Sequence, residues 1–224
     1  MKESGKKLFI LGGIFIVAFV IWTVLVCKVD VQPLGAEETN IGFASMNSKF
    51  HKLTCVHMGL YHITDWLGLV PIFVCMIFGF IGLVQLIKRK SLFKVDCDII
   101  LIGIYYMVVI FSYFIFEIIP INYRPVLIEG ALEVSYPSST TLLVLCVMPT
   151  FMEQVKRRSK NIIVNKIVMI FGICFSGYMV IGRLISGVHW ITDIIGSVIF
   201  SAGLFCLYKA VVLVRMSRNT HEMN

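Results

Sequence analysis

Charge is the first thing that this chain has little of. Only 15% of its 224 residues are Asp, Glu, Lys or Arg, whereas 58% are hydrophobic and the mean hydropathy is +0.89. Soluble domains carry about 25% charged residues, so the composition excludes an ordinary soluble domain. Internal repeats and low-complexity segments are absent as well. We therefore expect an integral membrane protein.

The sequence also lacks paired cysteines. Its seven cysteines are scattered, mostly inside or at the ends of apolar stretches, and none forms a C-x-x-C pair. An odd number of cysteines without ligand spacing argues against a disulfide framework and against a zinc site. We expect no metal and no other cofactor, with cysteine serving as a small apolar residue.

Apolar stretches recur along the chain at lengths close to the ~20 residues that a spanning helix needs. The fourth stretch is the weakest, because it is short, begins with the polar residues 138–141 and contains Pro149. The pattern predicts an all-α polytopic membrane protein, one domain over residues 1–224, with six transmembrane helices in a single bundle. The six spans are expected at 8–27, 66–87, 97–119, 137–153, 163–182 and 190–214.

The first connection, residues 28–65, is long enough to hold structure of its own. Its second half mixes apolar, aromatic and basic residues, a composition that suits a helix lying along the membrane interface. We expect an interfacial amphipathic helix there; a gate that contacts substrate is the alternative.

Basic residues are divided unevenly between the two sides of the predicted bundle. The N-terminus, the second and fourth connections and the C-terminus hold most of the 20 lysines and arginines. Positively charged loops stay in the cytoplasm, so both termini are expected to be cytoplasmic. The basic stretches at 88–90 and 156–160 are interpreted as topology signals that touch anionic lipid headgroups, not as nucleic-acid sites. The outward side keeps Lys28, Lys49, Lys52, Arg124 and Arg183.

The fifth connection brings an arginine, a histidine and an aspartate together in the stretch GRLISGVHWITD. Arg183 ends the fifth span, and His189 and Asp193 are four residues apart at the start of the sixth. Ionisable residues at a membrane edge are costly to place there and are functional by default. Asp193, one helical turn away, is expected to accept a hydrogen bond from one imidazole nitrogen and leave the other free to act as nucleophile or base.

The third connection, about 120–137, offers further polar groups on the same side of the membrane. Arg124 lies in INYRP, and the stretch PSST (137–140) leads into the fourth span. Hydroxyls and unpaired backbone N–H groups at a helix N-terminus, together with the helix dipole, form a pocket for an anion. Phosphate is therefore expected to bind Arg124, Arg183, Ser138 and Ser139.

These pieces, in this order, resemble the type 2 phosphatidic acid phosphatase superfamily, whose pattern is K-x6-R-P, then P-S-G-H, then S-R-x5-H-x3-D. The third motif is specific and keeps its last spacing in full, whereas the first two are partial. Six spans with outward motifs fit as well, so the resemblance covers most of the chain from about residue 50 onward. The matching residues are Arg124-Pro125, Pro137-Ser138, and Arg183, His189 and Asp193.

The resemblance implies a metal-independent lipid phosphatase. His189 would attack phosphorus and form a phosphohistidine that water hydrolyses, and Asp193 would orient the imidazole. The two arginines and the serines at 138–139 would hold the phosphoryl oxygens and neutralise charge in the transition state. The substrate would be a lipid phosphate or diphosphate at the outer leaflet of the cell membrane, such as polyprenyl diphosphate, phosphatidate or phosphatidylglycerol phosphate.

The chain departs from the family pattern at four positions. Gly182 replaces the serine before Arg183, and Ser139 replaces the motif glycine, which adds a hydroxyl. Glu117 stands where the pattern has lysine; a carboxylate cannot bind a phosphate dianion, so Glu117 either pairs with Arg124 or contacts a cationic part of the substrate.

Thr140 is the most serious departure, because it stands where related families have the histidine that protonates the leaving oxygen. Threonine cannot donate a proton near neutral pH, and general acid catalysis is worth roughly 10²–10⁴-fold. Catalysis is thus expected to be impaired. Either the substrate has a good leaving group, such as a diphosphate, or the substitution gives an inactive form.

Two other functions use the same residues. A phosphotransferase would pass the phosphoryl group from the phosphohistidine to another lipid or a sugar instead of to water. A catalytically silent lipid-phosphate binder or transporter would be consistent with Thr140 and Glu117. The phased His189 and Asp193 argue against the silent binder, because binding alone needs no oriented imidazole.

Overall fold

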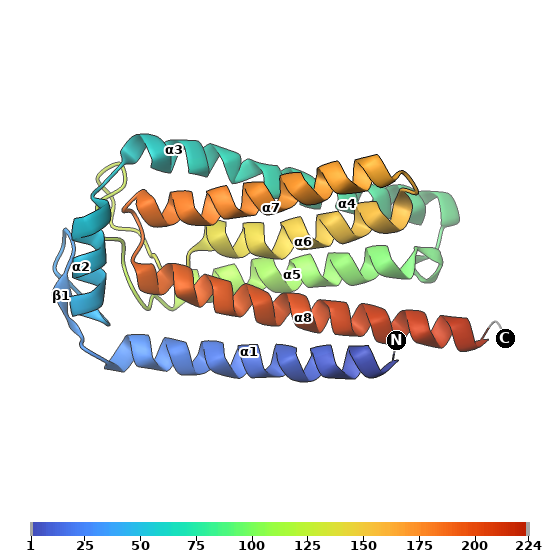
Figure 1. Ribbon diagram of the computed structural model, residues 1–224, viewed down its shortest axis with the longest axis horizontal. Helices are drawn as coiled ribbons and strands as arrows, with labels where there is room; N and C mark the ends of the chain where they lie inside the picture. The colour runs from blue at the N-terminus through green and yellow to red at the C-terminus, as the bar shows by residue number, and fades with distance from the viewer. Residues whose placement is uncertain (1, 223–224) are drawn as a thin grey trace.

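Long helices run side by side along the molecule, and a short helix and a β-hairpin cover one end of the bundle (Figure 1). The structure is a computed structural model that describes residues 2–222, with side chains from 3 to 215. The helices are α1 (Lys2–Lys28), α2 (Ala44–Thr54), α3 (Met58–Leu67), α4 (Leu69–Arg89), α5 (Cys97–Ile118), α6 (Ser139–Arg158), α7 (Ile162–Ile185) and α8 (Ile191–Glu222), with a 3₁₀ turn η1 (Leu92–Lys94) and a hairpin of β1 (Gln32–Leu34) and β2 (Thr39–Ile41).

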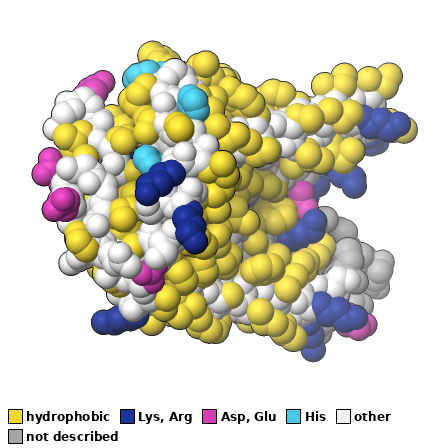
Figure 2. Space-filling view, turned by 60° about the vertical axis from the view of Figure 1, so that its left-hand side comes forward, with side chains coloured by type: hydrophobic (Ala, Val, Ile, Leu, Met, Phe, Trp, Pro, Cys, Tyr) yellow, Lys and Arg dark blue, Asp and Glu magenta, His cyan; other side chains and the backbone are white. Residues whose placement is uncertain are grey.

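Five helical segments of the described chain are long and apolar enough to cross a membrane: Glu3–Lys28, Met58–Arg89, Cys97–Ile118, Ile162–Ile185 and Ile191–Arg215. Their outer surfaces carry many exposed large hydrophobic side chains. Figure 2 shows these side chains covering the side of the bundle, with charged groups gathered near its two ends. The expectation of an all-helical, multi-pass membrane protein is confirmed.

The predicted fourth span corresponds to α6, which is less apolar than the other long helices. It packs against α4, α5, α7 and α8, and its polar residues Thr150 and Gln154 are fully buried. Because neighbouring helices cover α6, its surface needs less apolar character than a lipid-facing one. That α6 is a sixth transmembrane span stays a prediction.

The second candidate span begins at Met58, before the predicted residue 66. Gly68 keeps a right-handed helical conformation, so α3 continues into α4 and the segment Met58–Arg89 reads as one long helical unit. The first connection therefore ends before α3 and holds the β1–β2 hairpin and α2. Helix α2 lies across the end of the bundle (Figure 1), and its position at a membrane interface remains a prediction.

The two chain ends lie at the end of the bundle opposite to α2 and the hairpin (Figure 1). The basic stretches that close α4 and α6 belong to this same end. At the α2 end, α1 packs closely along α8, with the rings of Phe19 and Phe200 stacked at 4.2 Å and Phe116 edge-on to Phe19. This aromatic core fixes the start of α8, which carries the candidate site.

Candidate active site

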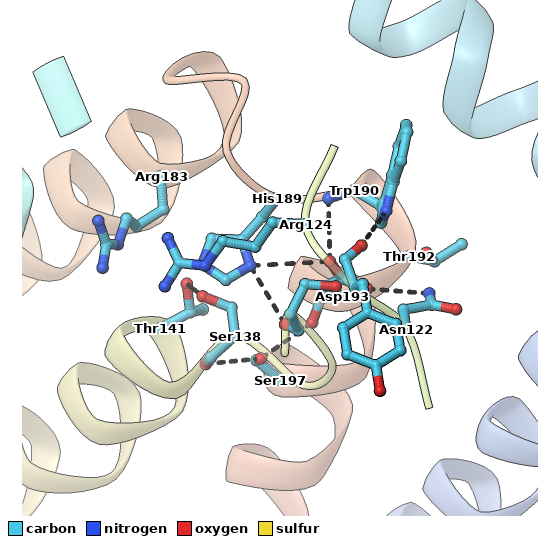
Figure 3. Close-up of polar contacts among 12 residues, drawn as sticks. Asn122, Arg124, Ser138, Thr141, Arg183, His189, Trp190, Thr192, Asp193 and Ser197 are labelled. Atoms are coloured by element: carbon cyan, nitrogen blue, oxygen red, sulfur yellow. Dashed lines mark hydrogen bonds and ion pairs between the residues drawn. The ribbon is translucent and has the colours of Figure 1, made fainter. Parts of the chain in front are cut away.

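The polar groups singled out in the sequence come together at the α2 end of the bundle. They are supplied by the connection between α5 and α6, the first turn of α6, the last turn of α7 and the turn that leads into α8 (Figure 3). Arg124, Arg183, Ser138, His189 and Asp193 are all buried there.

Arg124 and Arg183 converge on one aromatic ring. Their guanidinium carbons lie 5.6 Å and 5.0 Å from the centre of the Tyr61 ring. Each arginine also pairs with a carboxylate that sequence reasoning missed: Arg124 with Glu133 at 3.0 Å and Arg183 with Asp65 at 3.0 Å. Two buried cations held this close repel one another, so the carboxylates and the ring stabilise them.

His189 is held by one ring nitrogen. Its Nδ1 lies 3.1 Å from the carbonyl oxygen of Ser135, and a carbonyl only accepts, so Nδ1 carries the proton. The other nitrogen, Nε2, is therefore the one with the lone pair. Burial, reinforced by the charges of Arg124 and Arg183, lowers the pKa of His189 well below its ordinary range. The imidazole is thus neutral near pH 7, as a nucleophile requires.

The structure corrects the expectation that Asp193 accepts a hydrogen bond from His189. The closest Asp193 oxygen lies 3.7 Å from His189 Nδ1, beyond hydrogen-bond length, because the Ser135 carbonyl is nearer. Asp193 instead accepts bonds from the backbone N–H of Trp190 at 2.9 Å and from Asn122 at 3.2 Å. Its carboxyl group faces the protonated side of the ring, so it still favours the same tautomer.

The N-terminus of α6 approaches the same point. Ser138 is the N-cap residue and is fully buried, with its hydroxyl donated to Thr141 at 3.1 Å. The backbone N–H groups of the first helical turn have no carbonyl partner within the helix. The Ser138 hydroxyl is therefore engaged, and Ser138 serves mainly to position the start of α6. Ser139 borders the cavity that His189 lines.

Thr140 and Glu117 differ from what a phosphate cradle would contain. The Thr140 hydroxyl accepts a hydrogen bond from Arg183 at 2.6 Å. Glu117, near the end of α5, lines the small cavity shared by His189 and Ser139. Arg124 pairs with Glu133, so the structure does not bear out the pair with Glu117; contact of Glu117 with a cationic part of the substrate stays a prediction.

Several buried nitrogens at this point are left without a partner among the residues that the structure describes. They are Nε and Nη1 of Arg124, Nε and Nη1 of Arg183, and Nε2 of His189. Buried polar groups are nearly always satisfied, and exceptions call for an explanation. The four arginine nitrogens can donate hydrogen bonds, and Nε2 of His189 carries a lone pair. Together they suit a ligand that offers several acceptor oxygens and an electrophilic centre.

An apolar groove of about 500 Å³ between α4, α5 and α6 ends at this cluster. Its walls are made mainly of apolar side chains, and its polar end is formed by Asp65, Ser139 and Thr140. Such a groove fits a hydrocarbon chain whose head lies at the arginines. Among its apolar lining residues are Leu69, Ile72, Val109, Ile110, Leu142 and Leu143.

Gly187 sets the turn that carries His189. Its φ is +71°, and an added Cβ would overlap the carbonyl oxygen of Cys55. We expect Gly187→Ala to destabilise the fold by more than the ~1–3 kcal/mol that the backbone conformation alone costs. Thermal unfolding in detergent measures the loss.

Gly130→Ala is the matched control, because Gly130 has φ +81° with open space around it. It should show only the backbone cost. Equal melting temperatures for the two variants would mean that contact with Cys55 does not hold this turn.

Two comparisons with known proteins found a match to this chain. The model of the PAP2 superfamily matches residues 71–217. The crystal structure described as the first transmembrane PAP2-type phosphatidylglycerolphosphate phosphatase, from Bacillus subtilis, is similar with a TM-score of 0.63 at 17% identity, covering 92% of this chain and 96% of that one. No curated protein matches the sequence.

Proposed function

The chain belongs to the PAP2 superfamily, and we propose that it hydrolyses a phosphate or diphosphate ester of a membrane lipid through a phosphohistidine at His189. The observation that carries this proposal is the set of unpaired nitrogens of Arg124, Arg183 and His189 around one buried point. A tetrahedral phosphoryl group supplies acceptors for the guanidinium donors and an electrophile for Nε2.

In the first step, the His189 Nε2 lone pair would form a bond to phosphorus while the bond from phosphorus to the lipid oxygen breaks. Ser135 and Asp193 would stabilise the imidazolium that results, the former through the Nδ1–H bond of 3.1 Å. Water would then displace Nε2 and release phosphate. Arg124, Arg183 and the N–H groups at Ser139 would hold the phosphoryl oxygens throughout.

The carboxylates of Glu133 and Asp65 pair with Arg124 and Arg183. Both are partly exposed, at 42% and 55% of their side-chain surface, so water can solvate them once they are displaced. A phosphate dianion offers bidentate, charge-assisted bonds that compete with either carboxylate. Substrate binding would thus replace the two carboxylates with phosphoryl oxygens as the partners of Arg124 and Arg183.

The groove between α4, α5 and α6 supports a lipid as the substrate, since it would accommodate an acyl or prenyl chain next to the phosphate. The position of the site supports an outward orientation. It lies at the end of the bundle opposite to both termini and the basic ends of α4 and α6, which the positive-inside rule assigns to the cytoplasm.

Thr140 favours substrates with good leaving groups. Among polyprenyl diphosphate, phosphatidate and phosphatidylglycerol phosphate, the diphosphate loses a phosphate monoester, which needs less protonation than an alkoxide does. We therefore expect the fastest turnover with polyprenyl diphosphate.

Phosphate release from these three lipids by the purified protein in detergent tests the proposal. Release with a preference for the diphosphate would support it. Product analysis with an added acceptor lipid distinguishes transfer from hydrolysis. Saturable binding of all three lipids without release, in this chain and in Thr140→His alike, would identify a silent binder or transporter instead.

A further inference from the structure

Asp65 lies at the polar end of the apolar groove. It stands in the last turn of α3, and its side chain borders the groove together with Ser139 and Thr140. A carboxylate at the polar end of a groove that fits a lipid chain needs an explanation, because a carboxylate repels the phosphate that we expect to bind there.

One nitrogen ties Asp65 to the position that lacks a general acid. Arg183 Nη2 donates to Asp65 Oδ1 at 3.0 Å and to Thr140 Oγ1 at 2.6 Å. The carboxyl group therefore lies within two hydrogen-bond lengths of the Thr140 hydroxyl. A carboxyl group, which can accept and donate a proton, thus lies near the residue that cannot supply one.

The nucleophile and Asp65 face different cavities. His189 lines the small cavity with Glu117, whereas Asp65 and Thr140 line the groove. Ser139 borders both. A phosphoryl group held at Ser139, with its lipid in the groove, would have His189 in one cavity and its leaving oxygen in the other, near Asp65. An in-line displacement needs the nucleophile and the leaving oxygen on opposite sides of phosphorus.

We propose that Asp65 is the general acid and base of this chain, in place of the missing histidine. The inference rests on the proposed phosphatase function. As Nε2 of His189 bonds to phosphorus, the bond from phosphorus to the lipid oxygen breaks, and that oxygen takes its electron pair and the Asp65 proton. The lipid alcohol leaves. Water then attacks phosphorus, Asp65 takes a water proton, and the bonding pair returns to Nε2 as phosphate is released.

Two other carboxylates near the site, those of Glu133 and Glu117, do not fit this role. Glu133 pairs with Arg124 from the connection before α6 and does not border the groove. Glu117 lines the small cavity with His189 and does not border the groove in which the leaving oxygen would lie.

The test compares kcat/KM of Asp65→Asn on two substrates. This ratio reports steps up to cleavage of the ester bond, so later hydrolysis of the phosphohistidine does not enter. We expect Asp65→Asn to lower kcat/KM at least tenfold for phosphatidate, whose alkoxide needs a proton. For p-nitrophenyl phosphate, whose phenolate leaves unprotonated, the loss should stay below about threefold. Adding Thr140→His to Asp65→Asn should restore cleavage of phosphatidate.

Glu133→Gln is the matched control, because it removes a partly exposed carboxylate from the other arginine. It should leave the ratio between the two substrates unchanged. An equal loss on both substrates in Asp65→Asn, or no loss on either, would overturn the proposal, since Asp65 would then only position Arg183 or play no part. If the unchanged chain cleaves neither substrate, or His189→Ala cleaves both as well as the unchanged chain, the proposed function itself fails.

Discussion

Replacing His189 with alanine is expected to abolish phosphate release from every lipid substrate. The imidazole is the only described side chain in the cluster that combines burial, a neutral state and an unpaired nitrogen lone pair. Loss of a covalent nucleophile removes the reaction path itself, so the rate should fall at least about 10³-fold. Phosphate release in detergent, with lipid in excess, measures the change.

His189→Asn distinguishes loss of the nucleophile from loss of the fold as the cause of inactivity. Its amide can donate to the Ser135 carbonyl in place of Nδ1 but has no counterpart of Nε2, so it should be folded and equally inactive. The exposed His57, near the same end of the bundle, supplies a matched histidine, and His57→Ala should keep its activity. Substantial turnover by His189→Asn would remove the nucleophile assignment.

Introducing a histidine at position 140 is expected to raise turnover of phosphatidate at least tenfold. The new imidazole would lie at the polar end of the groove, next to the leaving oxygen, where general acid catalysis contributes roughly 10²–10⁴-fold. The gain stays near the lower bound if Asp65 already supplies a proton, and it becomes larger in Asp65→Asn. The groove of about 500 Å³ gives the larger side chain room.

Thr140→Val is the control for this prediction, because it also removes the hydroxyl that accepts from Arg183 but adds no acid. It should not raise turnover. Unchanged turnover in Thr140→His, or an equal gain in Thr140→Val, would refute a general-acid role for this position.

The fold could be predicted wherever the physical signal is local. Runs of apolar residues indicated the long helices, and the weakness of the fourth run reflects the covering of α6 by its neighbours. The β1–β2 hairpin and the continuation of α3 through Gly68 were missed. A three-residue strand pair gives almost no periodic pattern, and the sequence does not distinguish a glycine that continues a helix from one that ends it.

The site was predictable in part because ionisable groups at a membrane edge are conspicuous. Arg124, Arg183 and His189 could be found from that principle alone, and the structure brings them together. Their partners could not be found in the same way. Asp65 and Arg183 are 118 positions apart, and the bond from His189 to a backbone carbonyl carries no sequence signature. Asp65 itself, the only acidic residue in the second half of the predicted first connection, was the one available signal.

Trapping of the phosphoryl-enzyme tests the central claim most directly. Brief incubation with substrate carrying ³²P in its terminal phosphate, followed by quenching in base, should leave label on the protein that is stable in base and lost in acid, as a phosphohistidine requires. The label should be absent from His189→Asn. Label that persists in that variant, or that resists acid, would contradict an account in which His189 attacks phosphorus.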